Sequence, residues 1–308
     1  MKFNKYTKVL IGILVFYLVL YLVGPMVYSN QSFFETLIIF TILTLSFNIV
    51  YGFTGYLPFG YAAFFGLGAY GFGIAVMRGF DIETALAMGG ALSLLFAVIF
   101  IPMLRLKGAY FAIANLAAFE GIYYIFSNQS LDWLTRGPYG ISIPSVYNFG
   151  ETYVASVVIL VVITVLTLYI KTSNIGLAFK AIKEDQTTAS LSGINVPLYR
   201  AMAWMISALF AGFSGGLFAW YLSFFYPESV FSINYSLFVI VFTIFGGAGT
   251  LMGPIIGTIV LYSAYDTIGI TYPEYFTLIF GIAIILLVLF LPNGLMDLIS
   301  KYTKKEMV

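Results

Sequence analysis

The chain consists of long apolar runs separated by short clusters of charged residues and by Gly, Pro or Asn. A helix needs about 20 mainly apolar residues to cross the hydrocarbon core of a bilayer. On this basis we expect ten spans, at 9–27, 33–51, 56–77, 84–103, 109–127, 153–170, 201–222, 233–248, 254–266 and 276–291. The pattern predicts an all-α polytopic membrane protein with a single transmembrane domain over residues 1–308.

Two Gly-rich stretches, near residues 52–60 and 246–254, interrupt this pattern. A membrane helix can break where the freed backbone groups are buried in protein or line a cavity. Each stretch can therefore be a broken or re-entrant segment or a simple turn, and both interpretations keep an even number of spans. Both stretches contain a G-x-x-G pair, which is a weak sign of internal duplication.

Basic residues indicate the orientation, because Lys and Arg in short loops stay on the cytoplasmic side. With the N-terminus inside, all Lys and Arg except Arg78 and Arg136 fall in cytoplasmic segments. We therefore expect both termini to be cytoplasmic, and several acidic residues, Glu35 among them, to lie outside. The first apolar run is expected to be a retained span, since residues 23–26 offer no small-x-small cleavage site.

The composition excludes several classes of function. Of the 308 residues, 61% are hydrophobic and 9% charged, whereas a soluble domain is about a quarter charged. A net charge of +1 gives no electrostatic basis for binding nucleic acid. Cys and His are absent, which removes disulfides, thiolate nucleophiles, imidazole bases and Cys/His metal sites. We expect no catalytic residues, no metal site and no bound cofactor in this chain.

Two loops are longer than the others: residues 128–152 outside, rich in turn-forming residues, and residues 171–200 inside. The inner loop contains an amphipathic helical pattern. Its apolar side comprises Leu177, Ala178, Ala181, Ile182 and Ala189, and its mostly polar side comprises Lys180, Lys183, Glu184, Gln186 and Thr187. Gly193 is placed for a left-handed C-terminal cap, and Pro197 for the start of the next helix. The small apolar side favours docking in a protein groove, with a helix lying on lipid headgroups as the alternative.

Four blocks of sequence occur in a recognisable order and spacing. They are Arg105–Ile113 running on to Glu120, Gly137–Ile141, Ala181–Gln186 with Ala189 and Gly193–Asn195, and Gly246–Pro254. Together, over about residues 45–295, the chain resembles permease subunits of the branched-chain amino acid ABC transporter family, and more closely the larger of its two paired permeases. The resemblance implies a permease of the type II ABC importer kind in the inner or plasma membrane.

The resemblance also implies partners: a second homologous permease that shares the solute path, two ATP-binding subunits, and an external solute-binding protein. The ATPases would dock on the coupling loop, residues 171–200, through Ala181, Lys183, Glu184, Asp185, Ala189 and Gly193. ATP would be used only by those partners, which agrees with the absence of a G-x-x-x-x-G-K-[ST] phosphate loop from the sequence. Besides these proteins, membrane lipid is the only expected partner.

One departure from the family concerns Gly55–Tyr61. The family usually has Gly-x-x-Ser-Leu-Gly followed by His or Gln, and this chain has Pro58 in place of the serine. Urea and short-chain amides therefore stay open as solutes beside branched-chain amino acids. An ion-coupled secondary transporter is a further alternative, although it would need titratable or cation-binding groups at the membrane midplane.

Polar groups and helix breaks within the spans are the candidates for the solute path. The candidate residues are Asn48, Gly52, Gly55, Pro58, Asn115 and Glu120. Glu120 is expected to face the interior of the bundle, with a hydrogen bond between helices as the alternative to solute contact. Asn48 shares a helix face with Thr41 and Thr44, next to backbone groups that could bind the ends of a zwitterion, or it is a polar contact between helices. Gly249, Gly253 and Gly257 form a small-residue stripe suited to helix packing.

Overall fold

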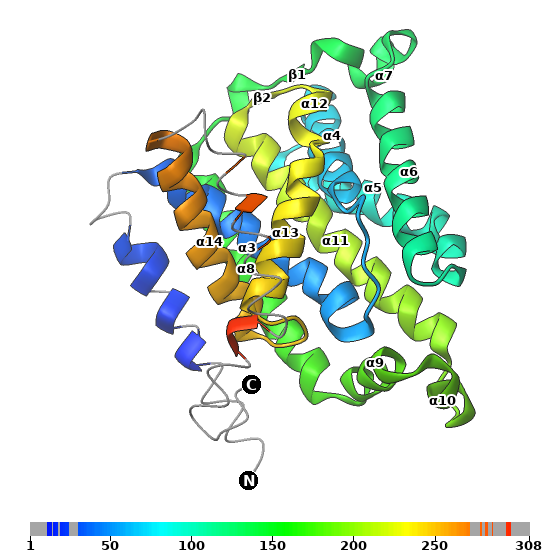
Figure 1. The fold of residues 1–308 in the computed structure, drawn as a ribbon. Helices are drawn as coiled ribbons and strands as arrows, with labels where there is room; N and C mark the ends of the chain where they lie inside the picture. Colours follow the sequence, from blue (N-terminus) through cyan, green and yellow to red (C-terminus); the bar gives the residue numbers. More distant parts are fainter. Residues whose placement is uncertain are drawn as a thin grey trace.

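The computed structural model describes residues 30–271 continuously, and outside that range residues 11–13, 15–17, 19–24, 278, 281–282, 285 and 294–296. Long helices form the body of this part of the chain (Figure 1): α3 (Gln31–Thr54), α4 (Ala62–Met77), α5 (Ile82–Ile99), α6 (Ala109–Phe126), α8 (Phe149–Thr172), α11 (Val196–Leu222), α13 (Ile233–Gly246) and α14 (Met252–Thr271). The short α-helices are α7 (Asp132–Thr135), α9 (Asn174–Glu184), α10 (Gln186–Leu191) and α12 (Pro227–Val230).

Further short elements complete the described chain. They are the π-helix η1 (Val19–Val23), the 3₁₀ helices η2 (Ile101–Arg105), η3 (Gln129–Leu131), η4 (Gly137–Tyr139) and η5 (Pro144–Val146), and the strands β1 (Ile141–Ser142) and β2 (Phe224–Phe225). The two strands pair antiparallel, with Ile141 opposite Phe225. Residues 128–152 thus form the compact series of turns that their composition predicts.

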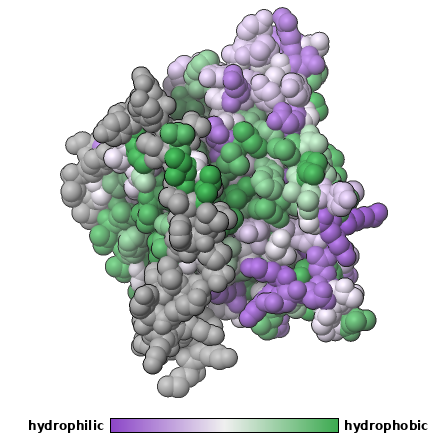
Figure 2. Space-filling view, in the orientation of Figure 1, coloured by the Kyte–Doolittle hydropathy of each residue, from purple (hydrophilic) through white to green (hydrophobic). Residues whose placement is uncertain are grey.

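Six helical segments of the described chain are long and apolar enough to cross a membrane: α3, α5, α6, α8, α11 and Pro227–Gly246. α4 is apolar but shorter. Figure 2 shows an apolar band between two polar ends, one carrying α7 and the other α9 and α10. The chain is therefore an all-α, multi-pass membrane protein. The predicted span at 9–27 is described in part, at residues 11–13, 15–17 and 19–24, whereas the predicted span at 276–291 lies mostly outside the described residues.

Helix α11 lies at the centre and packs on α3, α4 and α5. Glycines allow this packing, because a β-carbon at Gly215 would lie 1.8 Å from the Phe65 carbonyl oxygen and one at Gly68 1.9 Å from that of Gly212. Without a hydrophobic driving force between helices in lipid, such backbone contact supplies much of the attraction. Ser93 on α5 adds a hydrogen bond to the Phe64 carbonyl, at 2.6 Å. Three helices are thereby held together at small residues.

The exposed side of α8 has the composition expected of a lipid contact. Val154, Val158, Val162 and Val165 point outward along it, and each is at least 40% exposed. Its buried side carries Thr and Ser residues whose hydroxyls bond within the protein. This separation shows that α8 lies at the edge of the bundle with its polar groups turned inward.

Candidate functional site

The two Gly-rich stretches, more than 190 residues apart in the sequence, are in direct contact. The buried Asn48 side chain donates to the Thr250 carbonyl at 2.9 Å and accepts from the Gly249 amide at 2.8 Å. A β-carbon at Gly52 would lie 2.6 Å from the Gly249 nitrogen, so α3 can have no side chain at this position. We call this contact between residues 48–55 and 247–251 the glycine joint. Asn48 acts in it as a contact between segments, and Thr41 and Thr44 bond to carbonyls of their own helix.

The first stretch is a true break. α3 ends at Gly55, whose φ of 78° is left-handed and whose amide bonds the Tyr51 carbonyl at 2.9 Å. The chain then runs without helix to α4, past the buried Pro58. Side chains from distant helices satisfy the backbone: Asn115 accepts from the Gly60 amide at 2.7 Å, and Ser236 accepts from the Ala62 amide at 2.8 Å. The helix of the span expected at 56–77 therefore begins only at Ala62.

The second stretch differs from the predicted small-residue stripe. Gly249 precedes α14 and has a φ of 84°, so it is a turn residue that touches α3. Gly253 and Gly257 do lie on α14, where a β-carbon would meet the Gly247 carbonyl at 2.4 Å and the Phe242 carbonyl at 2.1 Å. The three glycines are regularly spaced in the sequence but have two roles. Gly249 is a turn residue, whereas Gly253 and Gly257 are helix-packing residues, because α14 starts between Gly249 and Gly253.

The loop at 171–200 forms two helices where the sequence predicts one. Asp185 ends α9 and caps α10, accepting from the Thr188 amide at 2.6 Å, and these hydrogen bonds hold the pKa of its carboxyl below the usual value. Gly193 has the predicted left-handed conformation, with a φ of 84°, and Pro197 stands in the first turn of α11. Both terminal signals are confirmed, because glycine conformation and proline geometry are local properties.

The apolar side of α9 packs against its own chain. Ile182, Ala189 and Val196 form a small buried cluster, and Phe179 is fully buried with its ring edge-on to Tyr199. The buried residues of this side are therefore not available to a groove in another protein, and docking of the loop on a partner stays a prediction. Leu177, assigned to the same side, is instead 67% exposed.

Polar side chains of α9 and α10 reach the glycine joint and the loop that follows it. The Lys183 ammonium donates to the Gly52 carbonyl at 2.8 Å, and the Gln186 amide donates to the Tyr56 hydroxyl at 3.0 Å. Partial removal from water lowers the pKa of Lys183, and the Glu184 carboxylate opposes that shift. The Arg200 guanidinium stacks 3.7 Å above the Tyr56 ring and bonds the Leu104 carbonyl.

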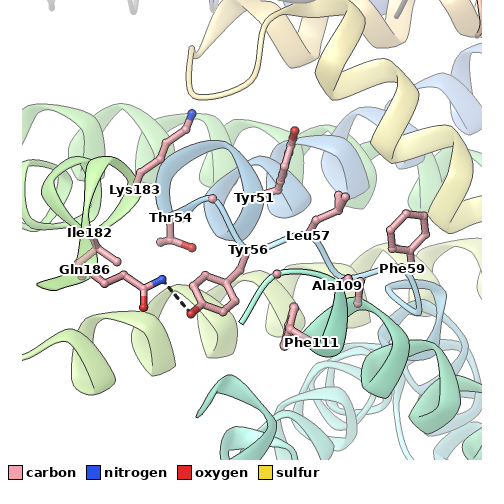
Figure 3. A pocket seen from close by; sticks show the side chains of 13 residues that line it. Tyr51, Thr54, Tyr56, Leu57, Phe59, Ala109, Phe111, Ile182, Lys183 and Gln186 are labelled. Carbon is pink, nitrogen blue, oxygen red and sulfur yellow. Dashed lines mark hydrogen bonds between the residues drawn. The ribbon is translucent and has the colours of Figure 1, made fainter. Parts of the chain in front are cut away.

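A cavity of about 360 Å³ lies beside these contacts (Figure 3). Its walls come from the end of α3, the loop at 55–61, the first turn of α6, and α9 with α10. Tyr51, Phe59 and Phe111 supply aromatic surface, while Gln186 and Tyr56 supply polar atoms. Because four separate segments form its walls, any displacement of α9 changes the shape of the cavity.

Comparisons with known proteins identify the family of the chain. The family described as "Branched-chain amino acid transport system / permease component" matches residues 29–289. This chain belongs to that permease family. Among curated relatives, the permease protein LivM of Salmonella typhimurium is 29% identical over 293 residues, covering 84% of this chain and 68% of LivM, and Escherichia coli LivM gives the same values. Salmonella typhimurium LivH is 25% identical over 282 residues, covering 83% and 91%. No solved structure matches the chain.

The relatives are of two kinds, LivM and LivH. Both LivM and LivH are named permease proteins of a high-affinity branched-chain amino acid transport system. The better match to LivM agrees with the resemblance to the larger permease, and the weaker match to LivH shows that a homologous second permease type exists. Membership of the family therefore implies a paired permease.

The coupling residues implied by the resemblance fall into different environments in this permease. Glu184 and Gly193 are exposed, whereas Ala189 is buried and Ala181 is partly buried. Asp185 caps α10, and Lys183 extends toward the glycine joint. Only part of the set is thus available to another protein, because the rest holds the two helices in place.

Glu120 does not face the interior of this chain. The inward side of α6 carries Phe111, Asn115 and Phe119, and Glu120 lies on the exposed side with Ile113 and Tyr124. The expectation of a partner within the same bundle was wrong because Asn115 and Phe119 determine which side of α6 turns inward. A carboxylate there faces lipid or another protein.

Glu35, which the sequence analysis assigned to the external side of the membrane, is a buried acid. Its side chain is fully buried between α3 and α8 and accepts from the Ser156 hydroxyl at 2.7 Å. Its other oxygen has no hydrogen-bond partner among the described residues. The position lies about one turn from the start of α3, within the span predicted at 33–51, and the sequence analysis did not single it out as buried.

Tyr56 and Arg200 are the site residues that the sequence did not single out. In the sequence Arg200 served only as one of the basic residues that indicate the cytoplasmic side. In the structure its side chain is buried, with 7% of its surface exposed. The available signal was its position in the second turn of a long apolar helix, where a charge needs partners.

Proposed function

We propose that this permease subunit imports branched-chain amino acids as part of a binding-protein-dependent ABC transporter. A second permease, two ATP-binding subunits and an external solute-binding protein complete the machinery, and this chain binds no cofactor. The observation that carries the proposal is the direct contact of α9 and α10 with a broken membrane segment, through Lys183 and Gln186. Such a contact can convert movement at the surface into movement of the membrane domain.

The orientation follows from the same proposal. Residues 1–308 form one transmembrane domain of ten spans with both termini in the cytoplasm, in the cell inner or plasma membrane. The end that carries α9 and α10 then faces the cytoplasm, and residues 171–200 are the coupling loop. The end with β1, β2 and α7 faces the external binding protein. Urea and short-chain amides are the competing solutes.

Reconstitution tests the proposal. The complete complex in proteoliposomes is expected to accumulate leucine and valine only with ATP and the binding protein, and to continue when ion gradients are collapsed. Uptake of urea or acetamide in preference to leucine would reassign the solute. Uphill transport by the purified chain alone, or dependence on an ion gradient, would refute the proposed machinery.

The outer surface of α9 and α10 is expected to bind the ATPases. Leu177 and Leu191 are 67% and 85% exposed, next to Glu184 and Gly193. An apolar anchor at an interface contributes about 2 kcal/mol or more, so Leu191→Glu should weaken ATPase binding roughly tenfold or more. Co-purification of the ATPases measures the effect, and Leu134→Glu at the opposite end is the control. Unchanged co-purification would exclude this surface.

The exposed side of α6 is expected to contact the second permease. A charged side chain at the centre of a lipid-facing helix costs about 2.5–3.5 kcal/mol, and Glu120 lies on this side well inside α6. Ala117 and Gly121 lie one turn apart, before and after Glu120, and their small size allows a helix of the second permease to approach α6 closely. The sequence has no Cys, so Ala117→Cys carrying a photoactivatable maleimide should cross-link to the second permease, while Val158→Cys on α8 with the same label should not. Equal cross-linking from both sites would contradict this interface.

A further inference from the structure

The contact between Lys183 and Gly52 meets a specific need of α3. The last carbonyls of a helix lack partners within it and form the negative end of its dipole. Gly52 lies in the last turn of α3, and the Lys183 ammonium, 2.8 Å from its carbonyl oxygen, supplies both a donor and a positive charge. Lys183 as a whole is an exposed residue, yet its ammonium donates to a backbone carbonyl of α3.

The same side chain crosses both halves of the glycine joint. A β-carbon at Gly55 would lie 3.5 Å from Lys183 Cγ, and one at Gly249 would lie 3.4 Å from Lys183 Nζ. Figure 3 shows Lys183 extending away from the Gln186–Tyr56 hydrogen bond. Both distances are ordinary van der Waals contacts, and it is the positive φ of Gly55 and Gly249 that favours glycine at these positions. Lys183 therefore bonds the end of α3 at Gly52 and lies beside the turn before α14 at Gly249.

Asn48 already joins those two segments to each other through Gly249 and Thr250. A link from α9 to one of them consequently acts on both. Gln186 contacts only the loop after α3, through Tyr56. Helix α9 also packs on α3, but among the described residues the side-chain hydrogen bond from α9 to the glycine joint is that of Lys183.

We propose that Lys183 is a positioning residue for coupled transport, which holds the glycine joint to α9 so that both broken segments move with it. The inference rests on the proposed function and assigns Lys183 to the membrane side of the coupling helix, away from the ATPases. Charge-assisted hydrogen bonds contribute more than neutral ones, so loss of this bond should separate ATP hydrolysis from movement of the joint.

The test measures solute transported per ATP hydrolysed in the complete complex. Lys183→Met should lower this ratio roughly tenfold while ATP hydrolysis changes by less than about twofold, since a hydrogen bond to a charged group contributes a free energy equivalent to a factor of ten or more. Lys183→Arg retains a charged donor and should restore most of the ratio. Lys180→Met removes a charge from the exposed side of the same helix and should leave the ratio unchanged.

Distances within the chain give a second measurement that is independent of uptake. Spin labels are attached at Thr187→Cys on α10 and at Ala248→Cys in the glycine joint. In the otherwise unaltered protein the distance between the two labels should be the same with and without ATP. In Lys183→Met the separation should change between the two states, with the complex still assembled.

Either of two results would overturn the inference. One is a wild-type transport ratio in Lys183→Met, and the other is an equal loss in Lys180→Met, which would place the effect at the ATPase surface. Absence of ATP-driven uptake by the unaltered complex would instead refute the proposed function. The two failures are therefore distinguishable.

Discussion

Replacing Asn48 with leucine is expected to destabilise the permease by about 2–6 kcal/mol and to abolish transport. The substitution keeps the size of the side chain but leaves the Gly249 amide and the Thr250 carbonyl without their side-chain partner. A buried polar group that loses its partner costs about 1–3 kcal/mol, and two are affected. The midpoint of thermal unfolding in detergent measures the first effect, and ATP-driven uptake the second.

Thr44→Val is the matched control for Asn48. Thr44 is also a fully buried polar residue of α3, but its hydroxyl bonds the Phe40 carbonyl of its own helix at 2.7 Å. Its loss leaves no donor unpaired, and we expect a change below about 1 kcal/mol. Equal stability of Asn48→Leu and Thr44→Val would show that the glycine joint does not depend on Asn48.

Replacing Gly215 with valine is expected to prevent correct folding of the bundle. A β-carbon at this position would lie 1.8 Å from the Phe65 carbonyl oxygen and 3.1 Å from the Ala69 nitrogen, and both are backbone atoms of α4. Helices α4 and α11 would have to separate, and overpacking of a tight contact costs about 1–3 kcal/mol or more. The yield of monodisperse protein after extraction measures the loss.

Gly150→Ala supplies the comparison for Gly215. Gly150 lies in the first turn of α8, where the nearest atom to a new β-carbon is Asn148 Oδ1 at 3.6 Å. Alanine should be tolerated there and should stabilise the helix by about 0.5–1 kcal/mol. A normal yield of Gly215→Val would mean that α4 and α11 do not cross as closely as the structure shows.

The contacts of the α3 break combine a local signal with distant partners. Gly55 ends the helix because only glycine adopts its left-handed conformation without strain, and that property is visible in the sequence. The loop that follows is held by Asn115 and Ser236, which lie 55 and 174 residues from their partners. A break could therefore be predicted, but not the side chains that satisfy its backbone.

Glu120 and Glu35 likewise combine a position that the sequence predicts with an orientation that depends on distant residues. Hydropathy places Glu120 inside a span, and the structure agrees. Whether a side chain points inward depends on the rotation of its helix, which Asn115 and Phe119 determine for α6 by packing on the loop before α4. The buried position of Glu35 likewise depends on Ser156, which lies on another helix.

The sequence by itself determined the membrane class, most span positions, the places where the Gly-rich stretches interrupt the apolar pattern, and the helix end at Gly193 and helix start at Pro197. These depend on the transfer of apolar side chains from water and on the backbone preferences of Gly and Pro, both of which act over a few residues. The tertiary structure alone decided that the two Gly-rich stretches meet, that Asn48 joins them and that Lys183 reaches them. Those contacts involve backbone groups and side chains up to about 200 residues apart, so their energies exist only once the helices have packed.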